Sequence, residues 1–187
     1  MKLVKLMYVS MFAAIMGVLG LLPPIFTGIT PVPITLQTLG VMLAGSILGA
    51  RFSPKYAAYS QILFLLLVAT GLPLLSGGRG GIGVFVSPSG GYLIGYVAAA
   101  YLIGFLIYHM KKKTFFKRLL VNIIGGIIVI YSFGIPIQAF VMDIPITNAL
   151  FLSFVFLPGD LLKCIIATLL TVKMQHSRVL SERVTEV

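Results

Sequence analysis

Charged residues are scarce in this sequence, and their scarcity excludes an ordinary soluble domain. Only 10% of the 187 residues are charged, whereas 59% are hydrophobic. Soluble domains carry about 25% charged residues, which they need to solvate their surfaces. The natural solvent of this chain is therefore lipid. Runs of roughly 20 apolar residues predict an all-α protein that crosses the bilayer as helices.

Cysteine and the familiar catalytic motifs are nearly absent as well. The single cysteine, Cys164, excludes an internal disulfide, and its apolar neighbours favour a small buried side chain over a reactive thiol. No GxxxxGK[ST], HExxH or GxSxG motif occurs, so the chain lacks a P-loop for ATP. No cysteine and histidine cluster supports a metal. We therefore expect neither an enzyme nor a metal site.

Long apolar runs are abundant, and we count six. The fifth run contains Pro136 and is expected to be kinked or broken there. The sixth is short for a full crossing, so residues 147–157 are either part of it or a separate interfacial or re-entrant helix. We expect a single domain over residues 1–187, with spans at about residues 3–22, 35–50, 54–72, 90–110, 119–142 and 159–173.

The basic residues indicate how this six-helix bundle is oriented. If the spans alternate in direction, all but two of the 14 lysine and arginine residues fall on one side. Basic loops are cytoplasmic, so both termini are expected inside the cell. The net charge of +10 then reports topology, and we expect no nucleic-acid partner. The exceptions, Arg79 and Lys163, fall toward the outer side or within the membrane, as do Asp143 and Asp160.

Asp160 and Lys163, in the stretch LPGDLLK, are the first candidates for a binding site. Asp160 comes in the first turn of a helix, where the helix dipole favours a carboxylate, and Lys163 shares its face. On a soluble helix, a cap with a local ion pair would explain both residues. In a membrane each charge costs roughly 2.5–3.5 kcal/mol and usually faces the bundle interior. We therefore favour contact with a polar ligand.

The glycine-rich segment 76–92 is the second candidate. Its GRGGIG formally matches G-x-G-x-x-G, but no strand precedes it and no acid follows about 20 residues on, so a dinucleotide site is excluded. What remains is an outer loop in which Arg79 either binds a carboxylate or is simply solvated. Ser87, Gly91 and Tyr92 lie at the start of the fourth span and complete this candidate set.

Two further features concern helix surfaces. Gln37 lies in the first turns of the second span, where its amide either faces a cavity or bonds a neighbouring helix. In the first span, small residues form two pairs spaced by four, Ser10 with Ala14 and Ala13 with Gly17. Such pairs let helices approach closely, either inside this bundle or against another membrane subunit.

Four stretches together resemble the BioY family, the biotin-specific S components of energy-coupling-factor (ECF) transporters. The resemblance spans all six predicted helices and is clear over about residues 30–170. It implies a multi-pass protein of the bacterial cell membrane that binds biotin from outside and delivers it across. It also implies docking, through the small residues of the first span, onto an ECF transmembrane coupling subunit and two ABC-type ATPases. The stretches are VPITLQTLGVMLAGSILGAR, GLPLLSGGRGGIG, SPSGGYLIGY and LPGDLLK.

The resemblance also implies roles for the candidate residues. Asp160 would accept hydrogen bonds from the ureido N–H groups of biotin, while Lys163 would donate to the ureido oxygen or reach the carboxylate. Arg79 would take the other end of biotin, and Tyr92 would pack on its rings. Which end meets which charge stays open. Biotin would be the transported ligand, without a cofactor. The alternative is a self-sufficient secondary carrier or channel for biotin or another small vitamin.

Overall fold

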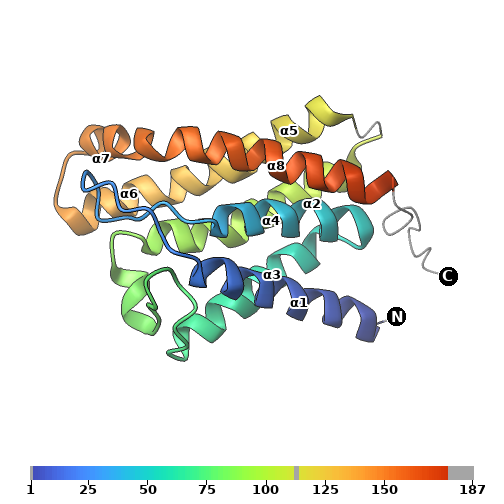
Figure 1. The fold of residues 1–187 in the computed structure, drawn as a ribbon, viewed down its shortest axis with the longest axis horizontal. Helices are drawn as coiled ribbons and strands as arrows, with labels where there is room; N and C mark the ends of the chain where they lie inside the picture. The colour runs from blue at the N-terminus through green and yellow to red at the C-terminus, as the bar shows by residue number, and fades with distance from the viewer. Residues whose placement is uncertain (1, 112–113, 177–187) are drawn as a thin grey trace.

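Helices make up nearly all of the regular structure in the computed structural model, which describes residues 2–111 and 114–176. These residues form no β-strand, only the isolated bridges Ile25–Ile34 and Leu75–Arg79. Figure 1 shows the helices lying side by side in one bundle. Their bounds are α1 (Lys2–Leu21), α2 (Gln37–Arg51), α3 (Pro54–Ala69), the 3-10 helix η1 (Ile82–Val86), α4 (Gly90–His109), α5 (Phe115–Ile123), the π-helix η2 (Ile124–Val129), α6 (Ile130–Met142), α7 (Ile146–Ser153), the 3-10 helix η3 (Phe154–Phe156) and α8 (Leu157–His176).

Several of these helices are long and apolar enough to cross a membrane. In the described part of the chain there are four such segments, and α3 is a shorter apolar helix. Each of the six predicted spans falls on one helical segment. The prediction of an all-α membrane protein is thereby confirmed. The four long segments are Leu3–Leu21, Gly90–His109, Phe115–Met142 and Ile146–Met174.

The fifth predicted span differs from the expectation in two ways. It begins at Phe115, four residues earlier than expected, and α6 continues through Pro136, so the helix is not broken there, whereas a kink stays a prediction. Pro136 is exposed on the outside of the bundle, so its ring does not press against a neighbouring helix. Membrane helices tolerate proline where the freed backbone groups find other partners. The irregular part of this span is instead the π-helical turn η2.

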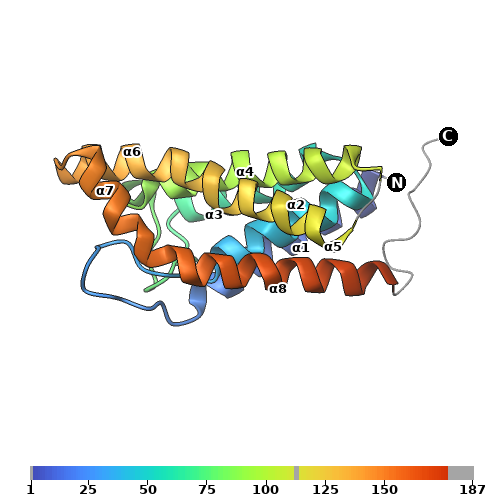
Figure 2. The same ribbon diagram turned by 90° about the horizontal axis from the view of Figure 1, so that it is seen from above.

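The region before the sixth predicted span forms a helix of its own. α7 is joined to α8 by the 3-10 turn η3, and Figure 2 shows α7 running at an angle to α8. α8 is also longer than expected, with 20 residues from Leu157 to His176. The first turn of α8 follows η3 directly, at the point where the chain changes direction after α7.

α4 lies at the centre of the bundle, packed against α2, α3 and α6. The crossing of α2 and α4 is close because glycines meet there. A β-carbon at Gly49 would overlap the backbone of Gly104, and one at Gly45 would overlap the Ile103 side chain. Glycine at these positions lets the two backbones approach, which is the usual way of packing helices in lipid.

The helix ends fall into two groups at opposite ends of the bundle (Figure 1). One end holds the start of α1, the α2–α3 turn, the end of α4, the start of α5 and the end of α8. The other holds the loop of residues 22–36, the loop of residues 70–89 and the α6–α7 turn. Basic residues Arg51, Lys55, Lys111, Lys117 and Lys173 lie at the first end. Lys112, Lys113, Arg178 and Arg183 lie outside the described residues.

Candidate functional site

A pocket opens at the end of the bundle opposite the basic residues. Its empty volume is about 580 Å³, including the open space at its mouth. The loop of residues 22–36 and the loop of residues 70–89 contribute to it together with α2, α4, α6 and α8. The lining residues are Val32, Pro33, Ile34, Thr35, Gln37, Thr38, Leu75, Ser76, Arg79, Ser89, Tyr92, Leu93, Tyr96, Ile130, Tyr131, Phe156, Asp160 and Lys163.

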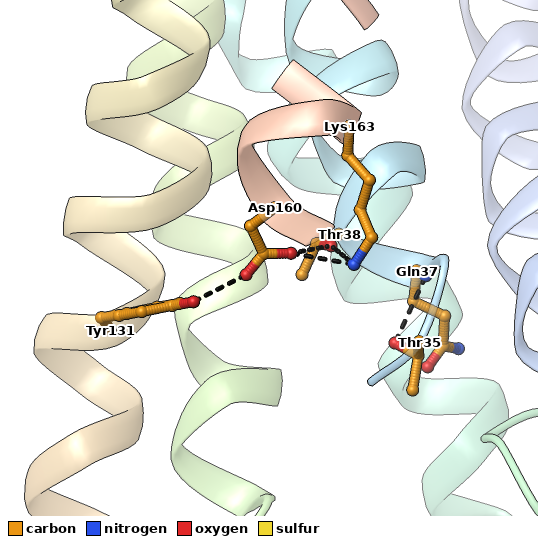
Figure 3. A network of polar contacts seen from close by, with 6 residues as sticks. All are labelled: Thr35, Gln37, Thr38, Tyr131, Asp160 and Lys163. Atoms are coloured by element: carbon orange, nitrogen blue, oxygen red, sulfur yellow. Dashed lines mark hydrogen bonds and ion pairs between the residues drawn. The ribbon is translucent and has the colours of Figure 1, made fainter. Parts of the chain in front are cut away.

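Asp160 and Lys163 form a buried ion pair in this pocket. The Lys163 Nζ lies 2.8 Å from the Asp160 Oδ1, and the two side chains are only 7% and 4% exposed. Thr38 of α2 completes the arrangement, since its hydroxyl donates to Oδ1 at 3.1 Å and accepts from Nζ at 3.0 Å (Figure 3). A buried pair is stable only if further hydrogen bonds satisfy its charges. The hydroxyl of Thr38 meets this requirement from a second helix.

The other carboxylate oxygen of Asp160 is bonded as well. The Tyr131 hydroxyl of α6 donates to Oδ2 at 2.8 Å (Figure 3). Asp160 also lies in the first turn of α8, where the helix dipole favours a negative charge. Side chains from α2, α6 and α8 therefore fix the orientation of the carboxylate before any ligand arrives.

Aromatic rings form the wall beside this ion pair. The Tyr92 ring meets the rings of Tyr131 and Phe156 edge to face, with centroids 6.1 and 6.2 Å apart. The Tyr92 hydroxyl donates to the Gln138 Oε1 at 2.7 Å and lies 3.0 Å from the Ser153 Oγ. Neither Gln138 nor Ser153 is among the residues that line the pocket, so the Tyr92 hydroxyl is bonded to residues behind the lining and its ring is the part available to a ligand. Edge-to-face contacts of this kind fix the positions of the rings.

Gln138 links the same wall to the loop of residues 22–36. Its side chain is fully buried, and its Nε2 donates to the Thr30 hydroxyl at 3.3 Å. Thr30 belongs to the loop of residues 22–36, whose Val32, Pro33 and Ile34 line the pocket. One amide therefore holds both the Tyr92 hydroxyl and the loop that borders the pocket.

Arg79 lies across the pocket on the glycine-rich loop. Its Nε donates to the Ser76 carbonyl at 3.2 Å and its Nη1 to the Ser89 hydroxyl at 3.5 Å. Gly77 and Gly78, with φ of 77° and 69°, form the tight turn between Leu75 and Arg79. Residues other than glycine rarely adopt such φ values, so the glycines place the guanidinium at the pocket. It is half-buried and keeps N–H groups for an anionic ligand.

Gln37 serves both of the roles that its position suggested. It lines the pocket, and its Nε2 donates to the Met16 carbonyl of α1 at 3.4 Å and to the Leu74 carbonyl at 3.2 Å. The residue is 2% exposed. It therefore ties α1 to the loop after α3 at the edge of the pocket.

The structure brings five of the seven predicted ligand residues to one pocket: Asp160, Lys163, Arg79, Gln37 and Tyr92. The remaining two, Ser87 and Gly91, are not among its lining residues. Ser87 donates to the Val84 carbonyl and lies 2.9 Å from the Ser89 hydroxyl, so it contacts a lining residue. Gly91 packs against Phe133 and Gly134 of α6, where a β-carbon would overlap the backbone. Contact of these residues with a ligand stays a prediction.

Sequence reasoning missed several polar residues of the pocket, among them Thr38, Tyr131 and Tyr96. Thr38 follows Gln37 directly, and Tyr131 is a lone phenol in a run of apolar residues. Hydroxyl groups in membrane helices usually bond within the bundle, so neither position stood out. Within the described residues, no group of three or more histidine, cysteine, aspartate or glutamate residues could hold a metal ion.

The two pairs of small residues on α1 lie on neighbouring faces of the helix and differ in burial. Ala13 and Gly17 are buried, and a β-carbon at Gly17 would lie 3.3 Å from the Leu74 side chain. Ser10 and Ala14 are exposed, on the same side of α1 as the exposed Met7 and Met11. Of the two pairs, only Ser10 and Ala14 are exposed, and docking of another subunit there stays a prediction.

Comparison with known proteins confirms the family resemblance. A model described as the BioY family matches residues 1–179. The chain is 50% identical over 182 residues to a "Probable biotin transporter BioY" of Bacillus subtilis, covering 97% of this chain and 96% of that one. It is 46% identical over 174 residues to a "Biotin transporter BioY" of Rhizobium etli, covering 88% and 89%. It also resembles a crystal structure, at 2.1 Å, of the S-component for biotin from an ECF-type ABC transporter. That match has a TM-score of 0.87 and 36% identity, over 94% of this chain and 92% of the other.

Proposed function

Because the chain belongs to the BioY family, we propose that it is the biotin-binding S component of an ECF-type vitamin transporter. It is a transport component and not an enzyme, and biotin is its transported ligand. The observation that carries the proposal is the buried Asp160–Lys163 pair, which opens into a pocket walled by aromatic rings. Charges inside a membrane protein usually mark a ligand pathway or site.

The pocket matches the chemistry of biotin along its length. Biotin has a ureido group on apolar fused rings at one end and a carboxylate on a valeryl tail at the other. Asp160 accepts from the ureido N–H groups, and Lys163 donates to the ureido oxygen. The rings then lie against Tyr92 and Phe156, which flank the ion pair. The tail points to Arg79 on the outer loop, whose guanidinium binds a carboxylate through two parallel hydrogen bonds.

The proposed topology places this pocket at the outer face of the bacterial cell membrane. Six spans, with both termini in the cytoplasm, put the basic end of the bundle inside, as the positive-inside rule requires. The loops of residues 22–36 and 70–89 then face outward beside the pocket mouth. Residues 1–187 act as a single membrane domain that receives biotin from outside.

Energy for transport comes from partner subunits in this proposal. The sequence has no P-loop, so ATP is hydrolysed by two ABC-type ATPases, coupled through an ECF transmembrane subunit. The exposed pair Ser10 and Ala14 on α1 forms the docking strip, because small residues let a partner helix approach closely. Ala13 and Gly17 support the strip from inside the bundle.

The test is biotin binding to the purified protein in detergent, measured by calorimetry. Asp160→Asn and Lys163→Ala each remove one member of the buried pair, and we expect affinity to fall by at least a hundredfold. Matched controls are Asp143→Asn, which changes an exposed acid, and Lys173→Ala, which changes an exposed lysine at the other end. Both controls should bind as the parent does.

Stability and transport measurements accompany this test. Breaking a buried pair costs about 3–5 kcal/mol of stability, so ligand-free thermal unfolding of each variant separates loss of fold from loss of the site. Unchanged affinity in Asp160→Asn and Lys163→Ala would reject the site. Biotin uptake by vesicles that contain this chain without any ATPase would favour a self-sufficient carrier instead.

A further inference from the structure

The span Phe115–Met142 contains a π-helical turn that ends directly before the first of its residues to line the pocket. α5 ends at Ile123, the turn η2 covers Ile124–Val129, and α6 begins at Ile130. In a π-helix each backbone N–H bonds the carbonyl five residues earlier instead of four, so the turn holds one extra residue. The first residues after it, Ile130 and Tyr131, both line the pocket.

Residues on both sides of this turn bond to α8. Before the turn, on α5, the fully buried Asn122 accepts a hydrogen bond from the Ser46 hydroxyl at 3.1 Å and donates one to the Thr168 hydroxyl of α8 at 3.0 Å. After the turn, on α6, the Tyr131 hydroxyl donates a hydrogen bond to Asp160 of α8. Asn122 and Tyr131 thus face the same helix, although they are nine residues apart in the sequence.

An unbroken α-helix could not place both residues on that side. Nine residues make about two and a half turns, so Asn122 and Tyr131 would point in opposite directions. If the π turn absorbs one residue, the spacing is equivalent to eight, and the two side chains are only about 80° apart. Both can then reach α8. The π turn therefore reconciles two sets of contacts that a regular helix would separate.

Packing holds the turn in place between two helices. A β-carbon at Gly125 would overlap the Ile103 side chain of α4, and one at Gly126 would overlap Met42 of α2. On the other side of the same turn, Ile128 is 58% exposed. The turn is thus fixed on its inner face, and its outer face has room for the extra residue.

We propose that the π turn η2 sets the register of the outer half of this span, and that Tyr131 is a positioning residue for Asp160. The hydroxyl of Tyr131 holds Oδ2 while Lys163 and Thr38 hold Oδ1, so the carboxylate is oriented before the ligand binds. Preorganisation of this kind improves affinity because less ordering is needed on binding. The role in biotin binding rests on the function proposed above, whereas the register itself does not.

The register is tested on the ligand-free full chain in detergent. With 3-fluorotyrosine at position 131, the fluorine NMR resonance should shift when Asp160→Asn is introduced. Deleting Ile128 removes the extra residue and leaves Tyr131 eight residues from Asn122 in a regular helix, so the same shift should persist. Inserting one leucine after Ile128 turns Tyr131 by about 100° further, and the shift should vanish.

A rescue variant makes this test sharper. In the insertion chain, Ile130 takes the place along the helix that Tyr131 holds in the parent. Ile130→Tyr combined with Tyr131→Phe therefore returns a phenol to the original direction. The Asp160-dependent shift should reappear when the fluorotyrosine is placed there. A deletion variant that loses the shift or fails to fold would overturn the register role, and so would an insertion variant that keeps the shift.

The positioning role is tested separately with biotin. Tyr131→Phe should weaken biotin binding by about tenfold, the typical effect of losing one hydrogen bond to a charged group. Tyr101→Phe, on the exposed side of α4, is the matched control and should bind as the parent does. Unchanged affinity in Tyr131→Phe would overturn the positioning role. If the parent chain itself does not bind biotin, the proposed function fails, while the fluorine result still decides the register.

Discussion

Replacing Arg79 by glutamine tests which end of biotin lies at the loop of residues 70–89. The guanidinium is half-buried, and its bonds to Ser76 and Ser89 use two of its five N–H groups. Glutamine keeps hydrogen-bonding capacity near the two serines but removes the charge. A hydrogen bond to a charged group contributes about 1.5–3 kcal/mol, and solvent at the pocket mouth favours the lower value. We therefore expect a loss of about tenfold in affinity for biotin.

The assay compares biotin with its methyl ester, which has lost the negative charge of the tail. Calorimetry on both ligands, with the parent chain and Arg79→Gln, gives a complete thermodynamic cycle. The parent should bind the ester about tenfold more weakly than biotin. Arg79→Gln should bind the two ligands with nearly equal affinity, because the charge that distinguishes them is gone.

Two results would refute this orientation. Equal weakening of both ligands by Arg79→Gln would mean that the guanidinium does not contact the carboxylate. If Lys163→Ala, and not Arg79→Gln, removed the preference for biotin over its ester, the tail would lie at the ion pair and the ligand would be reversed. Raising the salt concentration should also reduce the preference in the parent chain, because the pocket mouth is open to solvent.

Three further predictions concern the rest of the bundle. Ser10→Leu should leave biotin binding unchanged but reduce ATP-driven uptake in vesicles with the partner subunits, whereas Ala13→Leu should lower the thermal stability of the isolated chain. Gln138→Leu should speed biotin release several-fold in stopped-flow measurements, since it removes one partner of the Tyr92 hydroxyl and the bond that holds the loop of residues 22–36; an unchanged release rate would contradict this. Gly49→Leu should prevent α2 from packing on α4, visible as a lower midpoint of thermal unfolding, and a stable Gly49→Leu variant would contradict the close approach.

Much of the fold follows from two properties of the sequence, apolar runs and the placement of basic residues. Both are set by the cost of charge in lipid, which acts on each segment independently of its neighbours. The π turn η2 could not be predicted in the same way. The span around it is apolar on nearly every side, so one extra residue leaves no visible change in hydrophobic pattern. The backbone of residues 124–129 shows it in the structure, and the contacts of Asn122 and Tyr131 with α8 depend on it.

The charged residues of the candidate site could be predicted from the sequence, whereas most of its neutral polar residues could not. Asp160 and Lys163 stand out because an ionisable group inside a membrane segment is rare. Thr38 and Gln138 do not, since hydroxyls and amides are common at helix contacts and the sequence does not say which helices face each other. The tertiary fold decides that Thr38 meets the ion pair while Ser46, two turns further along α2, meets Asn122 instead.

The amide of Gln37 belongs at once to the pocket wall and to the attachment of α1, because its Nε2 holds a carbonyl of that helix. Anything that displaces this amide from within the pocket must also alter how firmly the first helix is held. Thermodynamic linkage is reciprocal. If a protein that binds α1 shifts Met16 and so changes the affinity for biotin by some factor, biotin changes the affinity for that protein by the same factor. Through this one side chain, biotin binding and the binding of a partner to α1 are thermodynamically coupled.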